Sequence, residues 1–498
     1  LYPKTVERGM LMAYNRERQL MPILLEMERQ GVPVDLPRLQ QDVDHYTAWQ
    51  NIIDAWIIKR LNAPTDINLD SGEQLMEAMI KAGKVDLEQA PLTPGGKYQT
   101  NKDALLLAVT DKVLLAVLKY RTQLGTCLST FMRPWLNTAI KSNGLIFTTW
   151  NQVRATHGPL STGAKTGRLS STPNFQNIPN PFKDMFQNEA NPKGPKCPWK
   201  DLPDLPSVRS YIIPFKGEVF IDRDFSQQEP RIMAHFEDGE LMAQYQENNW
   251  LDVHDNAQAK LAAAGKFYDR KPVKNTNLGL IYGMGAAKLA VKNEMTVVEA
   301  KGLKDDILRL YPGLKEMYKA MKQLYINNEP LRTWGGREYY CEPPKLINGR
   351  MQHFDYKMVN ILIQGSGADA TKEALIRFHT TKQAQTKIVL NVHDQITAST
   401  HPDLAAHQME VLRMAMEGLE FDVPLLSEGA ISGTNWNELK DYDKKGKLCD
   451  QKTLTSKRGA SAGTQRTSSA RRVPSTSTST SSKSRAVPRS KTVLVSTT

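Results

Sequence analysis

Between about residue 15 and residue 120, apolar positions recur with the spacing of α-helices. In ERQLMPILLEMERQG the apolar residues at 20, 23, 24 and 27 share one helical face, and Gly31 ends the pattern. Clusters of Asn, Asp, Gly and Pro between residues 63 and 101 indicate short helices joined by polar turns. We expect Asp70 or Ser71 to cap a helix over 73–79, and Asn101 to cap one that begins at Lys102. The pattern predicts an α-rich arm.

Two later segments read as strands because they are short and rich in β-branched and aromatic residues: GEVFIDRDFS, which carries Asp224 at its end, and KIVLNVHDQITAS, which carries Asp394. The chain between them is helical in pattern over residues 240–325, and LRTWGGREYY is typical of a hairpin around Gly335 and Gly336. A helical insertion between two strands of one sheet is therefore predicted.

Two segments lack this periodicity. Residues 179–206 are rich in Pro, Lys and Asn and indicate a long surface loop. After Asp441 the chain is dominated by Ser, Thr, Lys and Arg, with too few large apolar groups to offset the entropy of ordering, so we expect a disordered tail.

Composition places this chain of 498 residues, with 40% hydrophobic and 24% charged residues, among soluble globular proteins of several packed units. No apolar run is long enough to span a bilayer, and no signal peptide is visible. The net charge of +12 lies almost entirely in residues 451–498, which hold ten Lys or Arg and no acid, so the folded part is nearly neutral. Four cysteines without a CxxC pair suggest neither a zinc ribbon nor a disulfide framework, and a reducing, cytoplasmic compartment fits best.

Asp224 and Asp394 are the first candidates for chemistry. Each ends an apolar strand, where its side chain can reach the crevice beside a sheet. Two such carboxylates can share Mg²⁺ ions, whose hard oxygen preference and partial hydration suit phosphoryl transfer. Taken singly, each acid is equally an ordinary strand-end residue.

The second candidate is DRKPVKNTNLGLIYGMG, in which residues 270, 274, 278 and 282 recur every four positions and share one helix face. Pro272 is tolerated only in the first turn, so the helix starts near Asp269, with Arg270 and Lys274 at its positive end. A triphosphate fits there, with Leu278 and Tyr282 beside its sugar and base. By itself, a basic helix start is also typical of a solvated face.

The third candidate is STGAKTGRLSSTPNFQNIP, which offers Arg168, Asn174, Gln176 and Asn177 as donors for a nucleic-acid backbone or minor groove. The alternative is a polar turn cluster. In this order, TGRLSSTPNFQNIP, DFSQQEPRIMAH, RKPVKNTNLGLIYG and VHDQ resemble the ordered motifs of family A DNA polymerases, the bacterial polymerase I type with its bacteriophage members. The resemblance covers about residues 16 to 440.

By this resemblance the fold is α+β, a right-hand polymerase with an antiparallel palm sheet and helical fingers and thumb. The implied domains are a leader (1–15), thumb (16–120), first palm part (121–239), fingers (240–345), second palm part (346–440) and basic tail (441–498). The implied partners are primer–template DNA and deoxynucleotides, without a membrane, for a monomer that acts in phage replication or repair, in a bacterial host cytoplasm if viral.

The resemblance also implies residue roles. Asp224 and Asp394 match the palm aspartates that hold two Mg²⁺ ions, with Mn²⁺ as a substitute, and Lys274 matches a proton donor to pyrophosphate. The matches to residues around the incoming nucleotide are Arg270, Lys274, Leu278, Tyr282, Glu229, His254 and Gln228. The matches around DNA are Arg168, Asn360, Gln364 and His393, besides Asn174, Gln176 and Asn177. Glu229 matches the residue that excludes a ribose 2′-hydroxyl, and Gly283 one that gives the fingers room to rotate.

The chain departs from the family at several positions. Gln395 stands where an acid usually follows the His-Asp pair, Leu278 replaces an aromatic residue, and Gln228 and Pro230 replace apolar residues around Glu229. The only Asp-x-Glu singled out, Asp86-Leu87-Glu88, follows no apolar strand, so we expect no proofreading exonuclease site on this chain. An upstream domain that has been removed or exists elsewhere stays open, as does a DNA-binding role of the tail.

Two alternatives to a DNA polymerase stay open. A single-subunit RNA polymerase shares the two aspartates and the fingers Lys and Tyr, but Glu229 speaks against it. A catalytically silent DNA-binding protein of the same fold would not need to keep Asp224, Asp394, Arg270 and Lys274 together.

Overall fold

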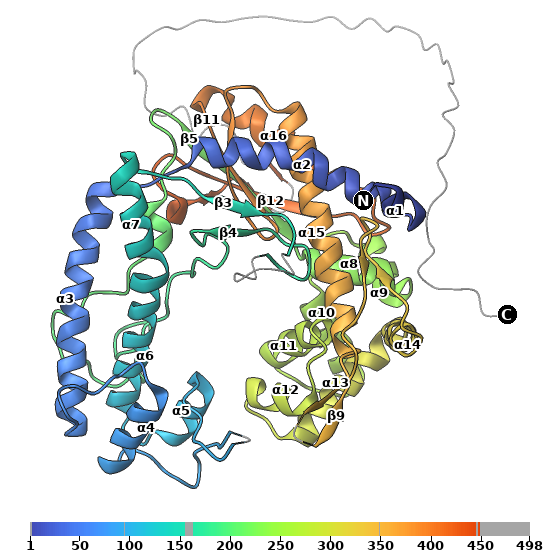
Figure 1. The fold of residues 1–498 in the computed structure, drawn as a ribbon. Helices are drawn as coiled ribbons and strands as arrows, with labels where there is room; N and C mark the ends of the chain where they lie inside the picture. Colours follow the sequence, from blue (N-terminus) through green and yellow to red (C-terminus); the bar gives the residue numbers. More distant parts are fainter. Residues whose placement is uncertain (1, 94, 155–162, 348, 445–446, 449–498) are drawn as a thin grey trace, which may run out of the picture.

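The computed structural model describes residues 2–93, 95–154, 163–347, 349–444 and 447–448. At its centre lies a five-stranded antiparallel sheet with the strand order β10-β11-β5-β12-β13 (Figure 1). The strands are β5 (Val219–Ser226), β10 (Lys387–Val392), β11 (Gln395–Thr400), β12 (Leu426–Ser432) and β13 (Lys440–Asp441). The predicted helical insertion is confirmed, because β5 pairs directly with β11 although the segment 227–394 lies between them.

The second predicted strand is wrong as a single element. β10 and β11 form a hairpin in which Val392 pairs with Gln395, and residues 393–394 make the turn. His393 takes a left-handed conformation with φ 58°. Such turns are normally announced by Gly or Asn, which are missing here, so the pattern gave no sign of a reversal. Asp224 also lies inside its strand, since β5 continues to Ser226.

One face of the sheet is covered by helices. Side chains alternate along β5, so that Ile221, Arg223 and Phe225 share one face and the aspartates of the strand share the other. Helix α16 (Ala405–Glu417) packs against β5 and β12 on the first face, where Arg223 Nε donates to Ser427 Oγ at 2.9 Å. The acidic face is therefore directed away from α16.

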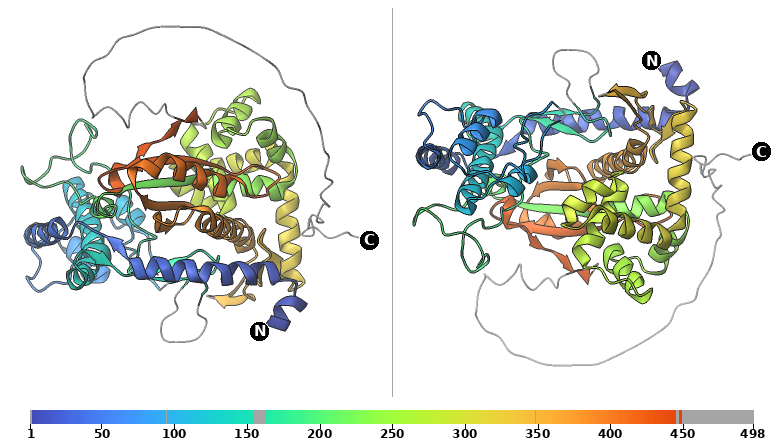
Figure 2. Two further views of the ribbon diagram at one scale, coloured as in Figure 1. Left: turned by 90° about the horizontal axis from the view of Figure 1, so that it is seen from above. Right: turned by 90° about the horizontal axis from the view of Figure 1, so that it is seen from below.

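Helices α2 (Leu11–Gln30), α8 (Gln228–Glu237) and α15 (Tyr356–Thr381) form a second group beside the sheet. Both α2 and α8 contact α15, and α2 also contacts β10 (Figure 2). Short elements complete this part of the chain: α1 (Tyr2–Glu7), β1 (Val32–Pro33), β2 (Leu145–Ile146), β3 (Thr149–Asn151), β4 (Ser170–Thr172) and the 3₁₀ turns at 208–211, 402–404 and 436–438.

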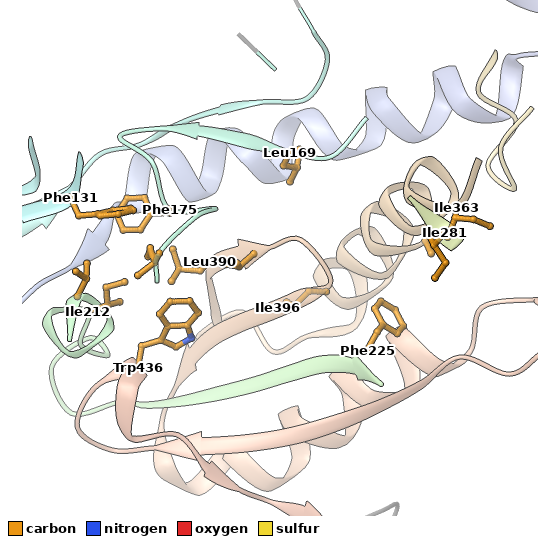
Figure 3. Close-up of a cluster of buried hydrophobic side chains, with 14 of the residues drawn as sticks. Phe131, Leu169, Phe175, Ile212, Phe225, Ile281, Ile363, Leu390, Ile396 and Trp436 are labelled. Atoms are coloured by element: carbon orange, nitrogen blue, oxygen red, sulfur yellow. The ribbon is translucent and has the colours of Figure 1, made fainter. Parts of the chain in front are cut away.

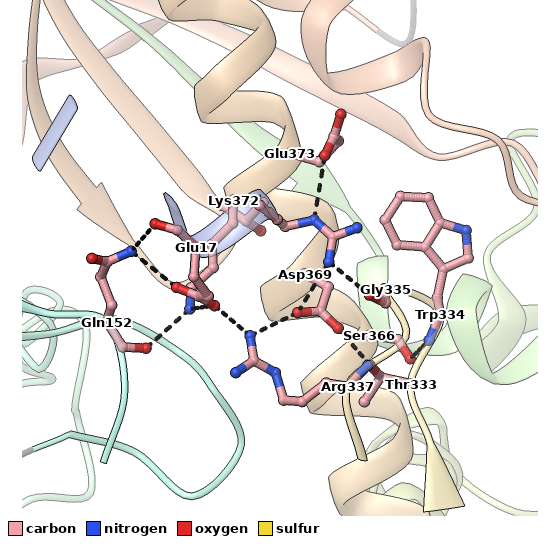
Figure 4. A network of polar contacts seen from close by, with 12 residues as sticks. Glu17, Gln152, Thr333, Trp334, Gly335, Arg337, Ser366, Asp369, Lys372 and Glu373 are labelled. Carbon is pink, nitrogen blue, oxygen red and sulfur yellow. Dashed lines mark hydrogen bonds and ion pairs between the residues drawn. The ribbon is translucent and has the colours of Figure 1, made fainter. Parts of the chain in front are cut away.

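A buried polar network fastens α2 to α15 (Figure 4). Lys372 Nζ donates to Glu17 at 2.6 Å, and Arg337 donates to both Glu17 and Asp369, at 2.6 and 2.9 Å. Arg16 lies 3.7 Å from Asp369. Because removing one partner of a buried pair leaves the other charge unpaired, this network ties the start of α2 firmly to the sheet region.

Residues 15–120 are α-rich as predicted, but α2 packs beside the sheet, so the arm itself begins at α3 (Leu36–Leu61) and continues beyond residue 120. It consists of α3, α4 (Gly72–Lys81), α5 (Lys102–Ala108), α6 (Lys112–Thr126), a π-helical segment (Cys127–Met132) and α7 (Arg133–Ala139), followed by a 3₁₀ turn at 140–142. Gly31 ends α2, Ser71 caps α4 through Gln74 N, and Asn101 caps α5, as predicted.

The long segment 179–206 contains no helix or strand, as predicted, but it is anchored along the arm. Trp199 packs against Trp56 of α3 with ring centroids 5.6 Å apart. The Tyr120 hydroxyl of α6 donates to the Pro203 carbonyl at 2.7 Å.

Helices also dominate the segment after α8, which stands opposite the arm in Figure 1. They are α9 (Glu240–Glu247), α10 (Val253–Ala263), α11 (Arg270–Ile281), α12 (Ala286–Asn293), α13 (Val297–Leu310) and α14 (Pro312–Ile326). The predicted hairpin follows as β6 (Leu331–Arg332) with β7 (Glu338–Tyr339), and a second hairpin as β8 (Lys345–Ile347) with β9 (Arg350–Gln352). Among the residues described, no helix is long and apolar enough to cross a membrane.

The hydrophobic core runs from the arm to the sheet (Figure 3). Trp135 of α7 stacks on Phe175 with centroids 4.8 Å apart, and Trp436 and Ile212 are fully buried nearby. Truncating one such aromatic residue to Ala typically costs about 3–5 kcal/mol.

The predicted start of disorder at residue 441 is too early. Tyr442 is buried and donates its backbone N–H to Gly429 O at 2.8 Å, and β14 (Asp443–Lys444) pairs with β15 (Lys447–Leu448). The buried Tyr442 and the pairing of β14 with β15 thus extend the ordered fold beyond β13. Residues 449–498 of the predicted tail lie outside the described residues.

Candidate active site

Asp224 and Asp394 lie next to each other at the junction of β5 and β11. Gln395, the residue after Asp394, is the cross-strand partner of Asp224, and Phe225 N donates to Asp394 O at 3.3 Å. The Asp224 side chain is exposed and Asp394 is half-buried. The structure therefore brings the two predicted acids together, through the hairpin turn rather than through two strand ends.

The surroundings of Asp224 and Asp394 disfavour the ionised forms of both carboxylates and raise their pKa values. The pKa of Asp224 is raised to about 8, first because the surrounding protein displaces hydration and then because Asp394, Asp222 and Glu428 repel its charge. The pKa of Asp224 is raised although its side chain still reaches solvent. Burial likewise raises the pKa of Asp394. A bound cation would relieve both effects.

The donor set fits a hard divalent cation. No group of three or more His, Cys, Asp and Glu suited to metal binding occurs among the residues that the structure describes. Two carboxylates nevertheless suit Mg²⁺, which is usually held by one or two protein carboxylates, with waters and substrate phosphates as the other ligands.

Two further acids near Asp224 were missed by the sequence analysis. Glu428 on β12 pairs with Asp224 on the other side of β5 and accepts from Ser226 Oγ at 3.1 Å. Asp222 lies two residues before Asp224 and is fully buried, which raises its pKa to about 6. Alternation along DRD was a signal for Asp222, whereas Glu428 requires the strand register.

Helix α11 carries the basic stripe as predicted, with Asp269 just before its first residue. Arg270 is exposed and forms ion pairs with Asp252, at 2.7 Å, and with Asp255. Lys274 is exposed one turn later, and Leu278 is half-buried. The basic start of this helix is thus held against acids of α10.

His254 is buried on α10, between the acids and α11. Its Nδ1 lies 3.1 Å from Asn277 Nδ2. Burial lowers the pKa of His254 below its usual value; Asp252 opposes this shift, and Lys274 and Arg270 add to it, so the ring is neutral at pH 7. A neutral imidazole can donate a hydrogen bond to an anion but brings no positive charge.

Glu229 connects three segments of the site. Its Oε1 accepts from Arg168 Nη2 at 2.7 Å, and its Oε2 accepts from the Tyr282 hydroxyl at 2.8 Å. Arg168 lies just before β4, Glu229 in the first turn of α8, and Tyr282 at the end of α11. Burial and the Glu229 charge raise the pKa of Tyr282 to about 12, which keeps its hydroxyl a donor.

Gly283 follows Tyr282 at a close approach to α15. It has φ 62°, and a Cβ there would lie 2.4 Å from Tyr356 O. Both the conformation and the space therefore require glycine at this position.

Gln176, predicted as a donor to nucleic acid, is directed into the protein. Its side chain is buried, donates to Asn391 O and accepts from His393 N at 3.3 Å. It therefore supports the turn that carries Asp394. Asn174 Oδ1 caps its own local turn by accepting from Gln176 N and Asn177 N, at 2.9 and 3.2 Å, and the Asn177 side chain is exposed.

Gln228 is also directed inward rather than toward a nucleotide. It is 3% exposed, and its amide donates to Gly367 O and Thr371 Oγ1 on α15, at 3.4 and 3.3 Å. The predicted nucleotide contact is thus a helix–helix contact, which explains how a polar residue replaces an apolar one beside Glu229.

Asn360, Gln364 and His393 lie around the same centre. Asn360 and Gln364 are one turn apart on α15, and Gln364 interacts with Tyr282. Asn360 Oδ1 and His393 Nδ1 are buried without hydrogen-bond partners in the described part of the chain. Burial and Arg168 lower the pKa of His393 to about 4, so its ring is neutral.

Comparisons with known proteins agree on one family. The model of DNA polymerase family A matches residues 44–438. The chain is similar to DNA polymerase I of Chloroflexus aurantiacus, with 27% identity over 86% of this chain and 43% of the relative. It is also similar to the thermostable DNA polymerase I of Thermus filiformis, with 25% identity over 88% of this chain and 50% of the relative. The chain thus spans about half the length of the curated relatives it matches.

A solved structure is also similar: the POL domain of Pol1 from M. smegmatis, in complex with DNA primer-template and dNTP. The TM-score is 0.67 at 25% identity, over 84% of this chain and 70% of that chain.

Proposed function

Because the chain belongs to DNA polymerase family A, with an α+β polymerase fold, we propose that it is a DNA-directed DNA polymerase. It adds deoxynucleotides to the 3′-hydroxyl of a primer on a DNA template. The observation that carries the proposal is the adjacency of Asp224 and Asp394, two mutually repelling carboxylates at the junction of β5 and β11.

Asp224 and Asp394 hold the divalent cations in this proposal. Bound there, two Mg²⁺ ions, for which Mn²⁺ can substitute, would lower the pKa of the attacking hydroxyl and stabilise charge on the leaving oxygen. Strand β5 and the β10–β11 turn fix the two carboxylates in place, so that little reorganisation is needed when the substrates bind.

Arg270 and Lys274 bind the triphosphate. They lie in the first two turns of α11, where the positive end of the helix adds to their charge. Lys274 also gives a proton to the leaving pyrophosphate, and neutral His254 contributes a hydrogen bond from α10. Leu278 and Tyr282 lie farther along, at the sugar and the templating base.

Glu229 selects deoxynucleotides. Held from both sides by Arg168 and Tyr282, its carboxylate cannot swing away from a ribose 2′-hydroxyl. This arrangement favours a DNA polymerase over a single-subunit RNA polymerase, which must leave room for that hydroxyl.

The primer–template contacts come from residues around Arg168 and α15. The unpartnered atoms of Asn360 and His393 gain partners when DNA binds, and Gln364, Asn174 and Asn177 add polar contacts. Purine N3 and pyrimidine O2 acceptors are present in the minor groove of every correct base pair, so such contacts sense pairing without reading sequence.

The proposed domains keep the predicted fingers (α9–α14) and a palm built on the five-stranded sheet. The proposed thumb is the arm α3–α7, which differs from the predicted range 16–120, because α2 lies beside the palm and the arm continues to Ala139. We propose that the chain acts as a monomer in phage replication or repair, and without proofreading. Asp86 and Glu88 support the last point, because they lie in a turn of the arm where Asp86 Oδ1 accepts from Glu88 N at 3.0 Å.

Extension of a labelled primer with Mg²⁺ tests the proposal, with deoxynucleotides, ribonucleotides and the variant Asp394→Asn compared. We expect extension with deoxynucleotides that disappears in the variant, while primer–template binding persists. The matched control is Asp86→Asn, which neutralises an acid on the arm and should extend normally.

The other outcomes are equally informative. If the wild-type protein binds primer–template but does not extend it, the catalytically silent alternative is indicated. If the wild-type protein extends the primer efficiently with ribonucleotides, the RNA polymerase alternative is indicated. Full activity of Asp394→Asn would exclude the metal role assigned to the aspartates.

A further inference from the structure

Asp222 is a fully buried carboxylate directly beside the two aspartates. It lies two residues before Asp224 on the same face of β5, and it is 2% exposed. Burying a carboxylate without hydrogen-bond donors costs free energy of folding, so the donors that contact Asp222 are needed to keep it buried.

Three donors from two other segments satisfy Asp222. Its Oδ1 accepts from Gln395 Nε2 at 2.7 Å, and its Oδ2 accepts from Thr397 Oγ1 and from Trp436 Nε1, the latter at 3.4 Å. Gln395 and Thr397 come from β11, whereas Trp436 comes from the 3₁₀ turn after β12. Asp222 thus joins both neighbours of β5.

The Gln395 bond stands out because of where its two ends lie. Gln395 directly follows Asp394 in the chain and is the cross-strand partner of Asp224. The bond therefore runs diagonally across β5 and β11, from the neighbour of one proposed metal ligand to the residue two before the other. A shift of Gln395 would therefore move Asp394, and a shift of Asp222 would move Asp224, so either shift changes the placement of the two aspartates relative to each other.

We propose that Asp222 and Gln395 are a positioning pair, whose hydrogen bond fixes the relative placement of the Asp224 and Asp394 carboxylates for binding divalent cations. This inference rests on the proposed function, because it assumes that the two aspartates hold metal. Residues that orient metal ligands typically change metal affinity by about 10- to 100-fold when they are replaced.

The chemistry of the pair makes a specific prediction about residue 395. A carboxylate only accepts hydrogen bonds when ionised, so Asp222 requires a donor at this position, and the Gln395 amide provides one. In Gln395→Glu two carboxylates would face each other, and the bond would be lost. In the double variant Asp222→Asn/Gln395→Glu the Asn amide can donate to the new Glu, so the bond returns with its direction reversed.

The experiment measures binding of Mn²⁺ alone to the full chain, by water-proton relaxation, which detects weak binding. We expect Gln395→Ala and Gln395→Glu to weaken Mn²⁺ binding by about tenfold or more. The double variant should return to within about threefold of the wild-type affinity. Thermal unfolding of every variant is recorded in parallel.

A matched control separates positioning from stability. Ser399 lies four residues along β11, is fully buried, and donates to Glu218 at 2.6 Å, away from the aspartates. Ser399→Ala removes a buried hydrogen bond of the same strand, so it should lower the unfolding temperature without changing Mn²⁺ affinity.

Two results would overturn the inference: Mn²⁺ affinity within twofold of wild type in Gln395→Ala, or a double variant no better than Gln395→Glu. The variant Asp224→Asn distinguishes failure of the positioning role from failure of the proposed metal site. If Asp224→Asn leaves Mn²⁺ binding intact, the metal site itself has been misassigned.

Discussion

Tyr282 and Glu229 are joined by a hydrogen bond of 2.8 Å between the tyrosine hydroxyl and Oε2 of the carboxylate. This bond connects the end of α11 with the first turn of α8, and Arg168 holds the other oxygen of Glu229. The proposed sugar selector is therefore fixed by the same residue that lies at the proposed templating position. In the proposed function, base recognition and sugar recognition therefore share the Tyr282 side chain.

Replacing Tyr282 with Phe should weaken discrimination against ribonucleotides. The change removes one of the two donors that hold Glu229, and hydrogen bonds to charged groups typically contribute about 1.5–3 kcal/mol. We expect the ratio of kcat/KM for deoxynucleotides and ribonucleotides to fall about tenfold, which corresponds to about 1.4 kcal/mol.

Tyr318→Phe is the control for this change. Its hydroxyl donates to Leu280 O on α11 at 2.6 Å without contacting Glu229, so its loss should affect stability alone. Unchanged discrimination in Tyr282→Phe would show that Arg168 suffices to hold the selector.

Asp255→Asn should lower the KM for deoxynucleotides. Arg270 is paired with Asp252 and Asp255, and these contacts compete with a triphosphate for the guanidinium. Because such exposed pairs are weak, we expect a decrease in KM of about two- to fivefold at low salt, shrinking as salt screens the charges. Steady-state kinetics at two salt concentrations measure the effect.

Glu294→Gln is the matched control, since Glu294 pairs with Lys271 of α11 at 3.6 Å and both side chains are exposed. Lys271 lies outside the basic stripe, so this variant should keep its KM. Equal shifts in both variants would indicate a general charge effect rather than release of Arg270.

Local rules were sufficient for much of the fold. Periodicity and Pro272 predicted a helix start near Asp269, and α11 begins at Arg270; an apolar run predicted β5 with Asp224. Two strands that flank a helical segment predicted one shared sheet, although their direct pairing is seen only in the structure.

Tertiary contacts decided what the pattern could not. The buried amides of Gln176 and Gln228 look like surface residues in the sequence, because only packing shows that backbone and side-chain partners surround them. Only strand register, which a single strand pattern does not reveal, brings Glu428 beside Asp224. Alternation along β5 places Asp222 on the same face as Asp224, but only the structure shows its partner Gln395.

Deleting residues 451–498 should reduce the salt dependence of DNA binding. This segment carries ten Lys or Arg and no acid. Each cation that neutralises a phosphate contributes about −0.9 to the slope of log K against log salt, so the truncated protein should show a shallower slope with unchanged kcat. Equilibrium binding to primer–template at several salt concentrations measures it. An identical slope would mean that the tail does not contact DNA.

Without metal, the protein should lose stability as pH rises from about 4 to 8. The pKa of Asp224 is raised to about 8, whereas an unfolded aspartate titrates near 3.9. Within this window the folded state holds a proton that the unfolded state has lost, so the free energy of unfolding falls with rising pH. Asp222, whose pKa is raised to about 6, adds to the fall at the acidic end.

Thermal unfolding in EDTA across this pH range tests the effect. Asp224→Asn should show a shallower fall, because its amide does not titrate. At pH 8, Mg²⁺ should raise the unfolding temperature of the wild type more than that of the variant, since the cation binds the ionised pair and offsets its repulsion. Parallel pH profiles of the two proteins, with equal responses to Mg²⁺, would contradict both the raised pKa and the assignment of Asp224 as a metal ligand.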